Sequence, residues 1–197
     1  MLLATRCPIC RRPDGSPCPE CVELLEPAPK VPRPLGLSQL HAALVYDGAA
    51  RLLVAGLKYR NARSAVSWVA EAMVSRLPEP HGCDVVTWAP TSDRRRHQRG
   101  FDQSELLARA VARRLHLPIA TMLRRRPGPS QTGRSAADRR DGVGFCARRS
   151  VEGLVVLVVD DVITTGATLG AAGQALVGAG AASVVGLVAG ATPPPGR

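Results

Sequence analysis

The sequence predicts an α/β fold, with a doubly wound, mostly parallel sheet and a small four-cysteine module at the amino terminus. The aliphatic run VVLVV at residues 155–159 has the length and composition of a strand buried on both faces, as in parallel sheets. Strand-like runs alternate with helical segments along most of the chain, which is the order of βαβ units. Two Cys-x-x-Cys pairs precede this alternation and predict the separate module.

Proline, glycine and turn residues set the boundaries of the predicted elements. In chain order, the sequence predicts a strand ending at the Asp47-Gly48 turn, a helix ending near Lys58, a helix over 64–77 stopped by Pro78, a strand over 83–90, a helix over Gln103–Leu115, a strand over 118–123, a long loop over 124–141, a strand over 155–159, a helix over 168–177 and a strand over 183–189. The predicted domains are a four-cysteine module over 1–26, a proline-rich extended linker over 27–36 and an α/β domain over 37–197.

The net charge of +10 comes from one part of the chain. Residues 94–149 hold 15 arginines and four acidic residues, a balance of +11, whereas the rest of the chain sums to −1. Such a segment attracts phosphates, either on a small ligand or along a nucleic-acid backbone. The alternative is a solvated surface, because 24 of the 26 basic residues are arginine. Aromatic residues make up only 3% of the chain, which argues against recognition of bases by stacking.

The cellular location is predicted from the amino terminus and from the uncharged run near the carboxyl end. MLLATRC lacks the apolar core of a secretory signal, and the uncharged run over 162–196 is mainly glycine and alanine. We therefore expect a cytoplasmic protein without a membrane span.

The acid pair Asp160 and Asp161 follows the aliphatic run directly. It is predicted at the strand's carboxyl end, where open α/β sheets bind ligands, and so facing solvent or ligand. A loop that opens the next helix comes after it, made of Thr164, Thr165, Gly166, Ala167 and Thr168. Hydroxyls and N–H groups at a helix amino end hold a phosphate, and Gly166 permits close backbone approach. A strand end with solvated caps is the structural alternative.

A second polar stretch, TSDRRRHQRGFD, follows the strand predicted to end at Pro90. Its four arginines, which include Arg96 and Arg99, supply donors where the charge of a diphosphate leaving group develops. Asp102 places a carboxylate in this basic stretch, where it would repel a diphosphate. An ordinary basic loop before a helix is the alternative.

The cysteine pattern predicts a metal site. Seven residues separate the pair Cys7 and Cys10 from the pair Cys18 and Cys21, and four thiolates at this spacing suit zinc. An iron–sulfur centre or two disulfides are the alternatives, although disulfides are unusual without an export signal. Cys83 and Cys146 lie outside this pattern, and we expect both to be buried or incidental.

The motifs together resemble known families. VVLVVDDVITTGATL resembles the phosphoribosyl-diphosphate signature of the type I phosphoribosyltransferases. RGFDQ at 99–103 is similar to the RGFNQ stretch of the ComF (competence protein F) family. LKY at 57–59 and SQTGRSAADRR at 130–140 resemble that family's Lys-Tyr pair and its mobile loop, and ComF proteins also carry an amino-terminal zinc ribbon.

The resemblance implies a protein that binds phosphoribosyl diphosphate with Mg²⁺ and transfers the ribosyl phosphate to an unknown acceptor, in a context of DNA uptake. It implies that Asp160 and Asp161 hold the ribose 2′ and 3′ hydroxyls and that the Thr/Gly loop holds the 5′-phosphate. Arg99 is then implied on the leaving diphosphate, with Arg96 and Lys58 among the ligand-binding residues; a surface lysine is the alternative for Lys58. The alternative function is a non-catalytic module that binds phosphoribosyl diphosphate or single-stranded DNA and serves DNA uptake.

Overall fold

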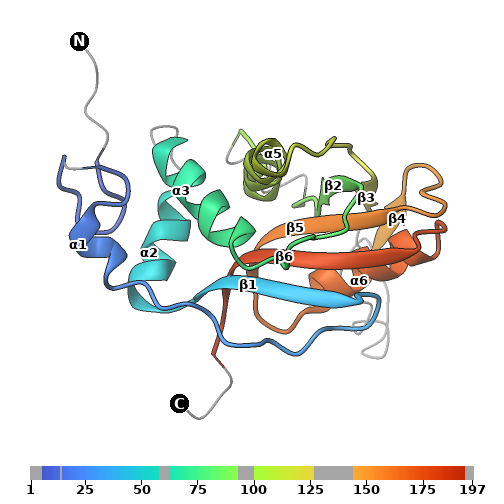
Figure 1. Cartoon of the computed structure of the whole chain (residues 1–197), viewed down its shortest axis with the longest axis horizontal. Coiled ribbons are helices and arrows are strands. Elements are labelled where there is room, and N and C mark those ends of the chain that lie inside the picture. The colour runs from blue at the N-terminus through green and yellow to red at the C-terminus, as the bar shows by residue number, and fades with distance from the viewer. Residues whose placement is uncertain (1–5, 14, 58–62, 93–99, 127–143, 194–197) are drawn as a thin grey trace, which may run out of the picture.

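A parallel sheet forms the centre of the computed structural model, which describes residues 6–13, 15–57, 63–92, 100–126 and 144–193 (Figure 1). Its four strands lie in the order β1-β6-β5-β2, and each neighbouring pair is parallel. The strands are β1 (Gln39–Val45), β2 (Val85–Trp88), β5 (Val155–Ile163) and β6 (Ser183–Ala191). The carboxyl ends of β2 and β5 therefore meet at the same end of the sheet.

Helices cover both faces of this sheet (Figure 1). On one face lie α2 (Gly48–Gly56), α3 (Arg63–Val74) and α5 (Gln103–Leu115), and on the other lies α6 (Ala167–Val177). Leu157 and Val159 of β5 join the first core, whereas Val156 and Val158 join the core under α6. Because both sides of the strand are buried, its sequence is a continuous aliphatic run. The predicted doubly wound α/β architecture is confirmed.

Short segments cover both edges of the sheet. At the β1 edge, the proline-rich segment pairs with the strand: the Ala28 N–H of the segment donates to the Ala43 carbonyl of β1 at 3.0 Å. At the β2 edge, the Val86 N–H donates to Pro118 and the Val86 carbonyl accepts from Ala120, at 2.9 and 3.0 Å. Covered edges leave few free backbone groups for pairing with other chains.

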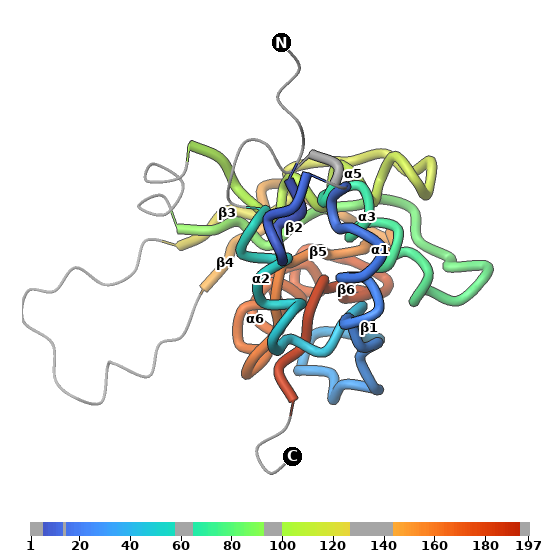
Figure 2. Tube along the Cα trace, turned by 90° about the vertical axis from the view of Figure 1, so that its left-hand side faces the viewer, coloured from blue at the N-terminus to red at the C-terminus, as the bar shows by residue number. Residues whose placement is uncertain are grey.

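A two-stranded antiparallel ribbon stands beside the sheet, made of β3 (Leu123–Arg125) and β4 (Phe145–Ala147) (Figure 2). The strand predicted over 118–123 is therefore wrong, because residue Ile119 makes only one bridge to β2 and the strand starts at Leu123. Leu123 and Phe145 are buried in the core under α6, and their pairing places Arg124 and Arg125 in a strand, although the sequence predicted a loop from residue 124.

Two strands continue beyond their predicted ends. β5 runs to Ile163 rather than Val159, and β6 runs to Ala191 rather than Ala189. Their pairing continues to Ile163 opposite Ala191, so each strand supplies backbone partners for the other. In contrast, α3 ends at Val74, three residues before the predicted end.

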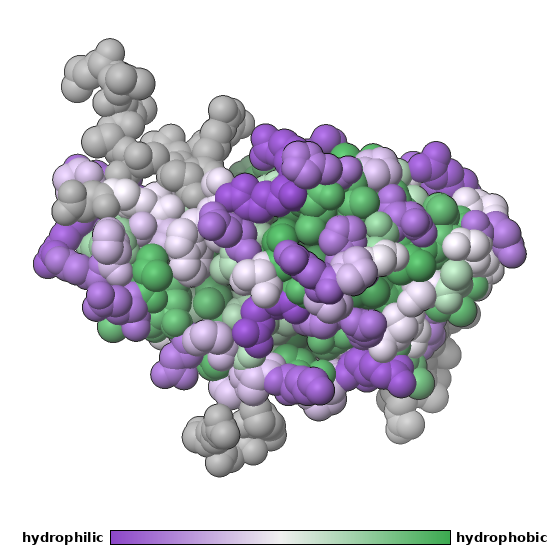
Figure 3. Space-filling model, viewed as in Figure 1, coloured by the Kyte–Doolittle hydropathy of each residue, from purple (hydrophilic) through white to green (hydrophobic). Residues whose placement is uncertain are grey.

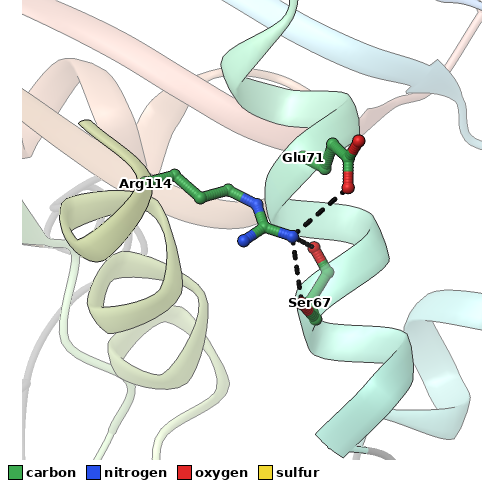
Figure 4. Close-up of polar contacts among 3 residues, drawn as sticks. All are labelled: Ser67, Glu71 and Arg114. Carbon is green, nitrogen blue, oxygen red and sulfur yellow. Dashed lines mark hydrogen bonds and ion pairs between the residues drawn. The ribbon is translucent and has the colours of Figure 1, made fainter.

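Helices α3 and α5 also contact each other at the surface (Figure 4). Arg114 Nη2 of α5 donates to the Ser67 carbonyl at 2.8 Å and to the Ser67 hydroxyl at 3.0 Å, and lies 3.3 Å from Glu71 Oε2. The Glu71 side chain is 75% exposed, so this ion pair contributes little and the buried residues between the helices hold them together.

The outer surface mixes polar and apolar residues. On the face shown in Figure 3, hydrophobic residues are interspersed with hydrophilic ones. Among the residues that the structure describes, each helix is too short or too polar to span a bilayer.

Candidate functional site

The acid pair lies inside β5 rather than after its end. Asp160 is only 8% exposed, and its Oδ1 accepts hydrogen bonds from the Ser104 hydroxyl at 2.7 Å and from the Asp161 N–H at 2.9 Å. Asp161 is half-buried, and its Oδ1 accepts from the Val162 N–H at 2.7 Å. The longer strand carries Asp160 under the start of α5, so Asp160 faces little solvent, contrary to expectation. That both carboxylates face a ligand stays a prediction.

The protonation state of Asp160 follows from this burial. Burial, and next the neighbouring charge of Asp161, raise the pKa of Asp160 to about 8, whereas the Ser104 hydroxyl opposes the rise. At neutral pH this carboxyl group therefore holds a proton in most molecules. Carboxyl groups with strongly raised pKa values gather at functional sites.

Asp102 has a structural role that the sequence did not predict. It is the N-cap of α5: its Oδ1 accepts from the Ser104 N–H at 3.0 Å, and its Oδ2 accepts from the Thr91 N–H at 2.8 Å. The side chain thus joins the segment after β2 to the start of α5. Both carboxylate oxygens accept from backbone N–H groups, and the residue is only 5% exposed. Asp102 therefore anchors the start of α5, in place of the predicted repulsion of a diphosphate. The capping spacing from Asp102 to Glu105 is the local signal that could have identified it.

Ser104 is the site residue that sequence reasoning missed. It is buried in the first turn of α5 and contacts Asp160 from 56 residues away in the sequence. A serine early in a helix is common, so no local pattern distinguishes it. Only the packing of α5 against β5 brings the two side chains together.

The Thr/Gly loop forms the turn from β5 into α6. Gly166 is the N-cap residue and has φ +79°, a left-handed conformation that glycine adopts without strain. Thr164 and Thr165 are exposed, so their hydroxyls can reach a ligand. The loop borders a small pocket of about 30 Å³. Its lining consists of Asp160, Val162, Ile163, Thr164, Thr165, Gly166, Ala167, Thr168 and Leu169. The acid pair's strand and the predicted phosphate loop are thus brought together.

The proline-rich segment lies directly behind this loop. A Cβ atom on Gly166 would come within 3.2 Å of Pro34, and one on Gly170 would come within 3.2 Å of the Leu35 carbonyl. On Gly173, a Cβ atom would meet the Gly36 carbonyl, too close for any real contact. The glycines of α6 therefore allow the segment over 34–36 to support the loop from behind.

Gly173→Ala should consequently destabilise the fold, although alanine normally favours a helix. The added methyl group must displace the backbone at Gly36, and overpacking of this kind costs about 1–3 kcal/mol. Urea unfolding of the variant measures the loss, with Gly178→Ala as control, because Gly178 ends the same helix with φ −63° and faces its own helix rather than residue 36. A variant as stable as the wild type would show that the close contact is not needed.

The four amino-terminal cysteines converge on one point. Their Sγ atoms all lie within 4.8 Å of one another, and Cys10 and Cys18 are 3.6 Å apart. Thiolates about 2.3 Å from a tetrahedral ion lie roughly 3.8 Å apart, so the cluster fits a metal ion. All four thiols are free rather than joined in disulfides, and those of Cys7, Cys18 and Cys21 are buried. Burial, and next the neighbouring sulfurs, raise the pKa of Cys21. Against the effect of burial, backbone hydrogen bonds lower the pKa of Cys7 to about 6.

The module packs onto the α/β domain beside α2. Ile9 contacts the core that α2, α3 and α5 share, and a Cβ atom on Gly56 would collide with Pro8.

The two cysteines outside the cluster differ from each other. Cys83 is buried, and Cys146 is half-buried, with its sulfur accepting from Arg126 Nε at 3.0 Å. Arg126 is the leading cause of the lowered pKa of the Cys146 thiol.

Three predicted ligand-binding residues, Lys58, Arg96 and Arg99, lie outside the described residues, as does the loop over 130–140.

A parallel sheet with an acid pair and a Thr/Gly loop at the end of β5 defines a protein of the phosphoribosyltransferase type, and the phosphoribosyl transferase domain model matches residues 102–194. The chain is 32% identical over 191 residues to the DNA utilization protein YhgH of Salmonella typhi, covering 90% of this chain and 80% of that protein. It is 26% identical over 187 residues to the competence protein ComFC of Bacillus subtilis, covering 91% and 74%. The chain belongs to the ComF family, which includes these YhgH proteins.

Proposed function

We propose that the protein binds phosphoribosyl diphosphate together with Mg²⁺ and transfers the ribosyl phosphate to an acceptor. The observation that carries the proposal is that Asp160 of β5 and the Thr/Gly loop that leads into α6 line one small pocket, with Asp161 next to Asp160 in the strand. Carboxylates beside a phosphate-binding loop match a ligand that has hydroxyls next to a phosphate. The relatives named for DNA utilization and competence support a context of DNA uptake.

Each group has a distinct part in this reaction. Asp160 and Asp161 accept hydrogen bonds from the ribose hydroxyls, and Thr164, Thr165 and the backbone at Gly166 hold the 5′-phosphate. Arg96, Arg99 and Lys58 lie on the diphosphate side in this proposal, where they offset the charge that develops on the leaving group. Mg²⁺ neutralises the diphosphate when bound. Catalysis then consists of positioning and electrostatic stabilisation.

Calorimetric titration of Mg²⁺-phosphoribosyl diphosphate into the protein tests binding. Ribose 5-phosphate and diphosphate should each bind more weakly than the intact ligand, because each contacts only part of the site. Diphosphate release on mixing with candidate acceptors then separates a transferase from a non-catalytic binding module. Absence of binding at millimolar ligand would reject the proposed site.

We also propose that the cysteine cluster of the amino-terminal module holds one Zn²⁺ in a structural role. Four sulfur ligands in a closed, mostly buried cluster suit structural zinc, whereas catalytic zinc keeps a position open for water or substrate.

A second candidate function is binding of single-stranded DNA along the β3–β4 ribbon. The observation that favours it is a hollow of about 880 Å³ between this ribbon and the carboxyl end of α6, away from the Thr/Gly loop at the helix's other end. Arg126, Arg148 and Arg149 border the hollow. Their charges suit a phosphate backbone, and the names of the relatives associate this family with DNA.

Neutralising Arg126, Arg148 and Arg149 to Gln together should flatten the salt dependence of single-stranded DNA binding, because these three arginines border the hollow. Each lost phosphate contact reduces the slope of log K against log salt by about 0.7, so the slope should fall by about 2. Fluorescence anisotropy across a salt series measures it. A triple variant of the exposed helix-surface residues Arg51, Arg109 and Arg113 is the control. Equal slopes in the two triple variants would remove the ribbon as the DNA site.

A further inference from the structure

A chain of hydrogen bonds connects three elements around the acid pair. The Thr91 N–H, after β2, donates to Asp102 at 2.8 Å, and Asp102 in turn accepts from the Ser104 N–H at 3.0 Å. The Ser104 hydroxyl then donates to Asp160 of β5 at 2.7 Å. Asp102, Ser104 and Asp160 are 5%, 4% and 8% exposed, so water competes little for these bonds.

We propose that Ser104 is a positioning residue for the ribose-binding acid Asp160, an inference that rests on the proposed function. Among the described contacts, both hydrogen bonds to Asp160 are made to Oδ1. With Oδ1 held by Ser104 and the Asp161 N–H, Oδ2 is the oxygen that remains for a ribose hydroxyl. Asp102 holds Ser104 in place through the backbone, so the N-cap of α5 determines the orientation of a carboxyl group on another element.

The electrostatics give Ser104 an effect beyond orientation. Two carboxyl groups face Asp160, Asp161 from the same strand and Asp102 from α5, and both disfavour its ionised form, as does burial. The Ser104 hydroxyl favours the ionised form because it donates to the carboxylate. Removing the hydroxyl should therefore make it harder for Asp160 to lose its proton and accept a ligand hydroxyl.

Ser104→Ala tests the inference, with Ser75→Ala as a matched control, because Ser75 is exposed just after the end of α3 and its hydroxyl donates to the Ala72 carbonyl. At pH 7, Ser104→Ala should bind Mg²⁺-phosphoribosyl diphosphate about tenfold more weakly than the wild type, since it loses the hydrogen bond that favours the ionised form of Asp160, which accepts the ligand hydroxyl. The deficit should shrink above pH 9, where Asp160 is ionised in both proteins. Carbon-13 NMR titration of the Asp160 carboxyl in the ligand-free proteins should show a higher pKa in Ser104→Ala and an unchanged pKa in Ser75→Ala.

The outcomes separate this inference from the proposed function. Wild-type affinity in Ser104→Ala, or a deficit that stays constant from pH 6 to 10, would overturn the positioning role while the ligand site stands. If the wild type fails to bind the ligand, the proposed function fails, and the NMR titration still decides whether Ser104 controls Asp160. An unchanged Asp160 pKa in Ser104→Ala overturns the inference in either case.

Discussion

Asp160→Asn is expected to weaken the binding of Mg²⁺-phosphoribosyl diphosphate and to stabilise the folded protein at pH 8. Asn keeps the shape and the oxygen that accepts from Ser104, but it lacks the charge. A charge-assisted hydrogen bond to a ribose hydroxyl contributes about 1.5–3 kcal/mol, so affinity should fall roughly ten- to a hundredfold. Opposite effects on binding and stability are typical of residues that serve a site at the expense of the fold.

The gain in stability depends on pH in a defined direction. The pKa of Asp160 is about 8 in the folded protein and close to 4 in the unfolded chain. Between these values the folded state holds a proton that the unfolded state has lost, so the wild type loses stability as the pH rises from about 4 to 8. Each pKa unit corresponds to about 1.4 kcal/mol, so the Asn variant should exceed the wild type by a few kcal/mol at pH 8 and match it near pH 4.

Two further variants provide the controls. Asp161→Asn should weaken ligand binding as well, but without the large gain in stability, because Asp161 is more exposed than Asp160. Asp84→Asn removes the same charge at the opposite end of β5, where Asp84 accepts from the Val155 N–H at 2.8 Å, and should leave affinity unchanged. Calorimetry measures affinity, and urea unfolding at pH 4 and pH 8 measures stability. Equal affinity in wild type, Asp160→Asn and Asp161→Asn would remove the acid pair from the ligand site.

The second large effect is expected at the metal cluster. The purified protein should contain close to one zinc per chain, and Cys21→Ser should lose it. Zinc binding stabilises small four-ligand modules by about 10 kcal/mol or more, so the module should unfold without the ion. The α/β domain should stay folded with a lower melting temperature, because Pro8 and Ile9 no longer cover α2 and the core beside it.

Metal analysis of protein purified without chelators, combined with thermal unfolding, checks this expectation. Cys146→Ser is the control, since Cys146 lies on β4, outside the cluster. It should retain the zinc and the wild-type melting temperature. Iron in place of zinc, or a Cys21→Ser variant that melts like the wild type, would contradict the assignment.

Local patterns in the sequence were sufficient to predict the architecture and to select the residues of the candidate site. A strand covered on both faces requires an apolar residue at each position, so VVLVV identified β5 and with it the doubly wound sheet. The acid pair, the Thr/Gly loop and the cysteine spacing are equally local, because each is contained in about 15 residues or fewer. Residues close in sequence stay close in any fold, so these predictions needed no knowledge of long-range packing.

Tertiary contacts decided what individual residues do. The extension of β5 depends on β6, and it placed Asp160 in the interior, where burial rather than sequence context controls its pKa. The contact of Ser104 with Asp160 joins residues 56 positions apart, and Asp102 became an anchor because Thr91 lies beside it. Such contacts arise when separate elements pack together. The sequence by itself therefore determined the fold class and the residues of the candidate ligand site, and the packing of α5 on β5 determined which carboxyl group is buried and which hydroxyl donates to it.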